Sequence, residues 1–146
     1  MIALTPLRLG RHLAVAVTLL GLAPAALAEP GDSFVCDMDA GGPIDDAFPE
    51  VVGVYIAEDA IYVMDPIINN YYGEPLEAKV ISDNDSRLSV RWVVKVKDEE
   101  TGRSIISLQY ELMILKQDLS ARIRLKKATG DSLEFKAMGT CKRERW

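Results

Sequence analysis

Hydrophobic and polar residues alternate with a period of two through the second half of the chain. In residues 87–97, every second residue from Leu88 to Val96 is apolar, and most of the residues between them are polar. This alternation is typical of a strand with one buried face. The same pattern recurs in residues 104–116, 121–127 and 133–141, so that four strands are predicted in this half.

Shorter apolar runs in the first half predict four more strands, at residues 33–36, 51–57, 60–64 and 76–82. Turns rich in Asp, Asn or Gly separate most of these segments. Sequential strands with hairpin-length connections predict an all-β protein, either an eight-stranded antiparallel up-and-down barrel or a closely related sandwich. Residues 111–125 could instead form a helix, but the alternation on both sides of their central turn favours two strands.

The first 28 residues have the pattern of a signal peptide. Arg8 and Arg11 precede an apolar run that ends in the small-x-small sequence ALA at residues 26–28, which predicts cleavage after Ala28. A retained membrane anchor is the alternative, but the run is short and rich in Ala for a spanning helix. We therefore expect a product that is periplasmic or secreted, with no membrane attachment after cleavage and a single domain at residues 29–146.

The two cysteines, Cys36 and Cys141, lie on the first and last predicted strands. An exported protein meets an oxidising compartment, so one disulfide is expected. The first and last strands are neighbours in a closed meander, whereas an open sheet would place the two cysteines too far apart to bond. Free thiols are the alternative, but there is no C-x-x-C pair, and the only histidine, His12, lies in the leader.

Charge is distributed unevenly along the chain. Without Arg8 and Arg11, the chain has 15 basic residues against 22 acidic ones, which argues against nucleic acid and anionic membranes as partners. Residues 29–85 contain 14 acids and one base, Lys79, while residues 86–146 contain 14 bases and eight acids. Either the two halves pair in one fold and partly compensate, or the first half builds an acidic face.

A meander places alternate connections at the same end of the barrel. One end would then carry the two longest connections, residues 37–50 and 66–75, and form an acidic rim that includes Asp65. The negative charge of such a rim would steer a cationic exported protein toward it, and its Tyr and Asn side chains would supply contact area and directional hydrogen bonds. The candidate binding residues are Asp45, Asp46, Asn69, Asn70, Tyr71 and Tyr72.

The same stretch, DPIINNYYGEP at residues 65–75, has a purely structural alternative. Asn, Gly and Pro are turn formers, and Asp can accept hydrogen bonds from nearby backbone N–H groups. Under this interpretation the stretch is turn architecture, and Ile67, Ile68 and one Tyr close the end of the barrel.

The interior of an eight-stranded barrel is just wide enough for side chains to fill it. The residues predicted to face inward are bulky, which favours a packed core over a lipocalin-like pocket for a small apolar ligand, although a carrier remains the alternative function. These residues are Val52, Val54, Ile56, Leu88, Trp92, Leu108, Tyr110, Leu112 and Phe135.

Catalysis and metal binding have little support. Without a histidine, the mature chain cannot build Ser-His or Cys-His nucleophile systems or histidine metal sites, and it has no phosphate-binding loop motif. Residues 37–48 partly resemble a calcium loop, but Phe48 stands where a bidentate Glu is needed. We expect no cofactor, no metal and no enzyme activity, with a carboxylate-based hydrolase as the remote alternative.

Through several short motifs, the chain resembles a family of small exported proteins of Gram-negative bacteria. The motifs are DPII at residues 65–68, GTC at residues 139–141, and the spacing of Gly73, Pro75, Ala78, Lys79 and Val80. The family is uncharacterised and contains disulfides and β structure. The resemblance implies a shared fold and export, and it implies no activity.

Overall fold

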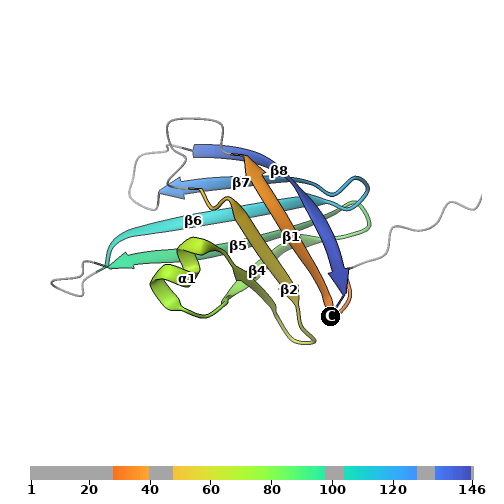
Figure 1. The fold of residues 1–146 in the computed structure, drawn as a ribbon, viewed down its shortest axis with the longest axis horizontal. Helices are drawn as coiled ribbons and strands as arrows, with labels where there is room; N and C mark the ends of the chain where they lie inside the picture. Colours follow the sequence, from red (N-terminus) through yellow and green to blue (C-terminus); the bar gives the residue numbers. More distant parts are fainter. Residues whose placement is uncertain (1–27, 40–47, 98–103, 128–133, 146) are drawn as a thin grey trace, which may run out of the picture.

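The computed structural model describes residues 28–39, 48–97, 104–127 and 134–145, which form a closed barrel of eight strands (Figure 1). Each strand pairs antiparallel with the next, and β8 pairs with β1. This arrangement confirms the predicted barrel. The strands are β1 (Asp32–Asp39), β2 (Val51–Ile56), β3 (Ile61–Met64), β4 (Leu76–Asp83), β5 (Arg87–Lys97), β6 (Ser104–Leu115), β7 (Ser120–Lys127) and β8 (Glu134–Arg145).

The connection between β3 and β4 contains a helix, α1 (Pro66–Tyr72). It lies near the start of β2, where Val51 borders the same hollow as Pro66 and Asn69, and its Ile68 is completely buried in the core. Ile68 thus belongs to the core, and Ile67 packs against it. Among the described residues, no helix has the length and hydrophobicity needed to cross a membrane.

Large apolar side chains fill the described part of the barrel interior. Of the nine residues predicted to face inward, only Leu108 and Phe135 are half-buried, and the others are buried. Trp92 stacks on Tyr110, with ring centroids 5.4 Å apart. The described residues with no accessible surface are Cys36, Val52, Val54, Val63, Ile68, Leu88, Val90, Val94, Tyr110, Leu112, Ile114 and Ile123.

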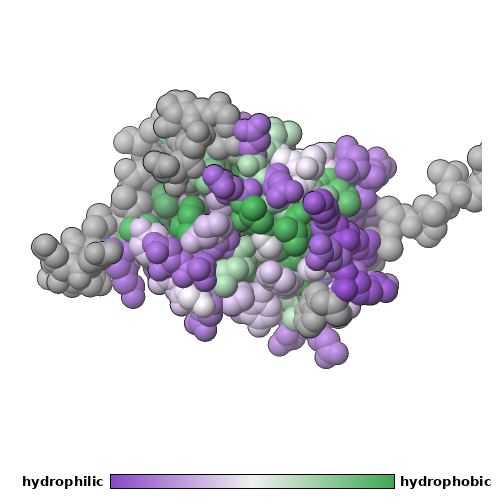
Figure 2. All heavy atoms as spheres, in the orientation of Figure 1, coloured by the Kyte–Doolittle hydropathy of each residue, from purple (hydrophilic) through white to green (hydrophobic). Residues whose placement is uncertain are grey.

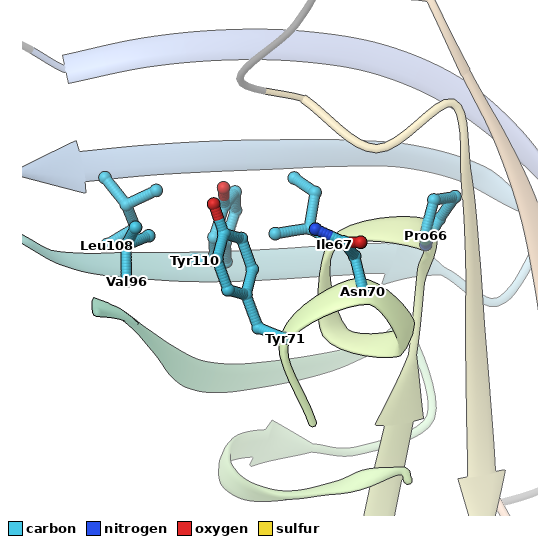
Figure 3. Close-up of a pocket in the computed structure, with 7 residues that line it drawn as sticks. All are labelled: Pro66, Ile67, Asn70, Tyr71, Val96, Leu108 and Tyr110. Carbon is cyan, nitrogen blue, oxygen red and sulfur yellow. The ribbon is translucent and has the colours of Figure 1, made fainter. Parts of the chain in front are cut away.

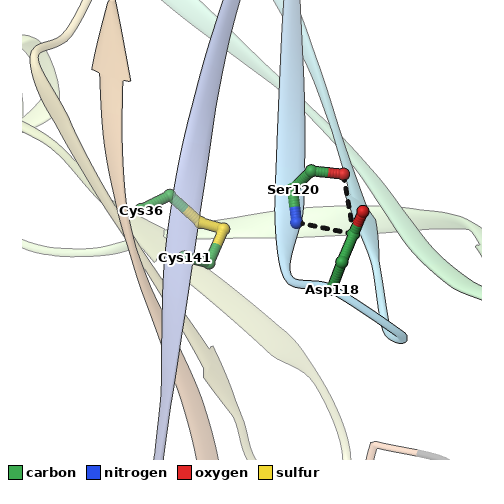
Figure 4. The surroundings of a disulfide bond; sticks show 4 residues. All are labelled: Cys36, Asp118, Ser120 and Cys141. Atoms are coloured by element: carbon green, nitrogen blue, oxygen red, sulfur yellow. Dashed lines mark hydrogen bonds between the residues drawn. A yellow bond between two sulfur atoms is a disulfide. The ribbon is translucent and has the colours of Figure 1, made fainter.

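The barrel closes at a seam between β1 and β8, where Cys36 and Cys141 stand directly opposite each other and form the predicted disulfide. At the short-turn end of the barrel, the Cys141 N–H donates to the Leu119 carbonyl at 2.7 Å. In the same turn, Asp118 accepts hydrogen bonds from the backbone and hydroxyl of Ser120, which hold the pKa of Asp118 below its usual range (Figure 4). The disulfide and the β6–β7 turn therefore meet at this end.

A buried carboxylate reinforces the seam. Asp32 is 1% exposed and pairs with Arg143 and Arg145 of β8. Burial alone would raise the pKa of Asp32, but the Arg143 guanidinium, the Glu29 N–H and Arg145 together hold it below its usual value. The Glu29 N–H donates to Asp32 at 2.8 Å, and the predicted cleavage after Ala28 would turn this nitrogen into a charged α-ammonium group.

Candidate functional site

Helix α1 has well-defined caps at both ends. Asp65 is the N-cap, and its carboxylate accepts a hydrogen bond from the Ile68 N–H at 2.7 Å. Pro66 occupies the first turn, and Gly73 ends the helix with φ of 70°, in the left-handed region that favours glycine. The prediction that this stretch is only a turn is wrong, because its Asp, Pro and Gly act as helix caps.

Asp65 also does not belong to an exposed acidic rim. It is buried, and one of its carboxylate oxygens has no hydrogen-bond partner among the described residues. Burial raises the pKa of Asp65 above its usual value, although hydrogen bonds from the Ile68 and Ile67 N–H groups oppose the shift. Its role is therefore local and structural.

The four candidate binding residues of α1 face different surroundings. Asn69 borders a hollow on the outer wall of the barrel, whereas Asn70 and Tyr71 border a hollow at the barrel mouth. The hydroxyl of Tyr72 accepts a hydrogen bond from the Lys95 N–H at 2.8 Å, which ties α1 to β5. These residues do not form one contact surface, and the other two candidates, Asp45 and Asp46, lie outside the described residues.

The mouth hollow has a volume of about 320 Å³ and lies between α1 and strands β5 and β6 (Figure 3). Tyr71 and Asn70 of α1 and Tyr110 of β6 all border it. Burial raises the pKa of Tyr110 far above its usual value, with nearby Asp65 and Tyr71 adding to the shift, so its hydroxyl stays protonated. The remaining lining is Pro66, Ile67, Val96 and Leu108.

A second candidate surface lies on the outside of β1, β2 and β3. Directly opposed residues of five neighbouring strands form a line across this wall, which we call the tyrosine row. Its centre is uncharged, and a carboxylate stands at each end. In strand order from β8 to β4, the tyrosine row consists of Glu144, Ser33, Tyr55, Tyr62 and Glu77.

Two hollows flank Tyr55 on this wall. One, of about 610 Å³, follows the tyrosine row and is bordered by Ala57, Glu74 and Pro75 as well as by row members. The other, of about 310 Å³, lies toward α1 and is bordered mainly by apolar residues, including Val35, Val51 and Met64. Figure 2 shows hydrophobic residues gathered over β1 and β2 and hydrophilic ones over the C-terminal part of β8.

The carboxylates of the wall have no cationic partners among the described residues. Glu74, Glu77 and Glu144 are exposed and belong to none of the ion pairs of the described chain. At the seam nearby, the carboxylates of Glu29 and Asp32 pair instead with arginines of β8. The first half of the chain therefore compensates part of its charge at the seam, while its Glu74 and Glu77 stay unpaired on this wall among the described residues.

The opposite wall carries a line of charged residues, which we call the cationic row. It runs from β4 to β8 through directly opposed positions, and Glu111 at its centre pairs with Arg91 at 2.8 Å. Glu134 adds contacts to two further members, at 3.4 Å and 3.9 Å. The cationic row consists of Lys79, Arg91, Glu111, Arg124 and Lys136.

Tyr55 and Tyr62 are not among the candidate residues that the sequence predicted. The signal was present in the alternation itself, because Val52, Val54 and Ile56 face inward and therefore place Val51, Gly53 and Tyr55 outward. An outward face without charge is unusual in so acidic a segment. Comparison of the chain with protein-family models, curated proteins and solved structures found no match, so the site is interpreted from its geometry alone.

Proposed function

We propose that the protein is an exported, non-enzymatic binding module that recognises a cationic partner protein through the outer wall of β1, β2 and β3. The observation that carries this proposal is a hollowed, largely apolar wall flanked by carboxylates that have no partner among the described residues. Apolar area supplies affinity, while unpaired charge at the border steers a partner of opposite sign.

Export is supported by the disulfide and by the leader pattern of residues 1–28. Disulfides persist in oxidising compartments, which here means the periplasm or the outside of the cell. The proposed partner is therefore a basic protein of the same compartment. Asn69 stays in the proposal at the border of the wall, while Asp45 and Asp46 remain predicted contributors that lie outside the described residues.

The test uses two valines with matched exposure. Val51 on the proposed wall is 40% exposed, and Val93 on β5 is 41% exposed. A photo-crosslinking amino acid would replace each valine in turn, and the disulfide-bonded chain from Glu29 onward would be irradiated in the exported fraction of its own cells. We expect basic proteins to be captured from position 51, with a yield that falls as salt screens the attraction.

Capture from both positions alike, or yields that do not respond to salt, would contradict a cationic partner on this wall. Adducts from position 93 alone would place the binding surface on the wall that carries the cationic row. Both variants must first show the unfolding midpoint of the unmodified protein, so that lost capture is not lost folding.

The alternative function, carriage of a small apolar ligand, is supported by one observation, the mouth hollow bordered by Tyr71 and Tyr110. Its volume is at the lower end of the range for ligand sites, about 300–1,000 Å³. A naphthylamine dye that binds with a blue-shifted emission, and loses this binding in Tyr71→Ala, would support a carrier. We expect no saturable binding of such a dye.

A further inference from the structure

The two central tyrosines of the tyrosine row, Tyr55 and Tyr62, border the same hollow, which we call the slot. Tyr55 and Tyr62 stand directly opposite each other on β2 and β3, at positions where side chains normally touch. Among the described residues, the two rings in stacking contact are those of Trp92 and Tyr110. The rings of Tyr55 and Tyr62 form no such pair.

Gly53 explains how the slot stays open. The ring of Tyr55 lies back along its own strand over Gly53, and its hydroxyl oxygen is only 2.9 Å from where a Cβ on Gly53 would stand. A larger residue at position 53 would have to displace this ring from its place over the strand. The glycine therefore allows Tyr55 to lie flat on the wall and expose ring surface beside Tyr62.

The chemistry of the slot matches long cationic side chains. Lysine and arginine carry apolar stems that cover aromatic surface, and their charged ends are attracted to the faces of tyrosine rings. Glu144 at one end of the hollow and Glu74 at the other are free to accept the charge. The Pro75 and Ala57 borders supply further apolar contact for the segment that carries these side chains.

The row also sets a spacing. Glu144 on β8 and Glu77 on β4 are four strand intervals apart, which corresponds to a path of about 19 Å along the curved wall at the usual distance between neighbouring strands. An extended peptide rises by about 3.3 Å per residue, so about six residues span this distance. Residues separated by an even number point to the same side of an extended segment, so two cations six positions apart would face the wall together.

We propose that the tyrosine row is a groove for an extended segment of the partner, with arginine or lysine side chains about six positions apart at Glu144 and at Glu74 and Glu77. This inference rests on the proposed function and adds the form of the ligand. The alkyl stems lie over Tyr55 and Tyr62, and the guanidinium or ammonium groups pair with the carboxylates at the two ends.

The test compares two peptides of identical composition and charge. In acetyl-Arg-Ala-Ser-Val-Ser-Ala-Arg-amide the cations are six positions apart, and in acetyl-Arg-Arg-Ala-Ser-Val-Ser-Ala-amide they are adjacent. Each peptide would be titrated into the disulfide-bonded chain from Glu29 onward, with NMR shifts of the β1–β3 backbone as the readout. We expect the spaced peptide to bind about 3- to 5-fold more tightly, as one additional exposed ion pair allows.

Three variants locate the contact. Changing Tyr55 and Tyr62 together to Ala is expected to weaken the spaced peptide about 5- to 10-fold, through the loss of two cation–π contacts. Glu144→Gln should weaken it about 2- to 5-fold. Glu58→Gln removes an exposed charge from the β2–β3 turn outside the groove and serves as the matched control, with a change of less than about 2-fold.

Equal affinity for the two peptides, unaffected by the tyrosine change, would contradict the proposed groove. Binding would then rest on general charge attraction, which is still compatible with the proposed function. The groove would also be contradicted if position 51 crosslinks to a partner but neither peptide binds. The wall would then bind the surface of a folded protein and not an extended segment. If the protein instead forms salt-sensitive dimers and the tyrosine change abolishes them, the occupant is the cationic row of a second copy, and the peptide proposal fails.

Discussion

The tyrosine row and the cationic row cross the same barrel on opposite walls and differ in every outward feature. The tyrosine row has an uncharged centre with unpaired carboxylates at its ends, whereas the cationic row has a paired glutamate at its centre and basic residues on both sides. Both rows lie over an equally buried interior. Inward residues determine that the barrel forms, so outward residues are free to differ with function.

The two walls also differ in how they are held. The tyrosine row crosses β2 and β3, which have six and four residues, while the cationic row crosses β5 and β6, which have eleven and twelve. Short strands have few backbone hydrogen bonds of their own. The tyrosine wall therefore depends more strongly on the seam with β8 and on α1, and the following predictions test this dependence.

The largest effect is expected from the disulfide. Changing Cys36 and Cys141 together to Ala should lower the free energy of unfolding by about 2–5 kcal/mol, because the bridge closes a loop of 105 residues. Hydrogen exchange should then lose protection in β1 to β3 before β5 and β6. Urea unfolding and exchange measurements would check both points, and equal loss of protection on the two walls would contradict the comparison.

The next largest effect is expected from Asp32. Asp32→Asn should cost about 1–3 kcal/mol at pH 7, because Arg143 and Arg145 lose a charged acceptor. The pKa of Asp32 is lowered by folding, so this stabilisation is present above the usual carboxyl pKa of about 3.9 and is lost as the pH falls through the lower folded value. The difference between variant and parent, measured by urea unfolding, should therefore shrink below about pH 4.

Helix α1, beside the tyrosine wall, is expected to respond less. Asp65→Ala should cost about 1 kcal/mol through loss of the N-cap. Asp65→Asn is the matched control, because Asn caps equally well and carries no buried charge, so it should be neutral or stabilising. Since folding raises the pKa of Asp65, its ionisation opposes folding as the pH rises, and the Asn variant should show its advantage at neutral rather than acid pH.

The smallest effect is expected on the cationic row. Arg91 and Glu111 form a partly exposed ion pair, so a double-mutant cycle with Arg91→Gln and Glu111→Gln should give a coupling of about 0.2–1 kcal/mol that weakens in high salt. Peptide binding at the tyrosine row should not change. A coupling of several kcal/mol would show that the stability of this wall, too, depends on one specific interaction.

Prediction from sequence worked best where burial repeats along a strand. The alternation in β5, from Leu88 to Val96, identified both the strand and its inward face, since a one-residue shift would expose every apolar side chain. It failed at residues 66–72, because Asp, Pro and Gly are both turn formers and helix caps, and a two-turn helix is too short for its period to be recognised. The dispersal of Asn69 to Tyr72 follows from that helix.

The sequence by itself predicted eight sequential antiparallel strands and the pairing of Cys36 with Cys141, because strands follow from local alternation and these are the two cysteines of the chain. It left a barrel and a related sandwich open, and the pairing of β8 with β1 in the structure decided for the barrel. Only the tertiary structure decided which residues share a surface. The tyrosine row joins Glu144 to Ser33 across the seam and then continues to Tyr55 and Tyr62, and this alignment depends on strand register. Register is a property of paired strands, so no single segment of the sequence contains it.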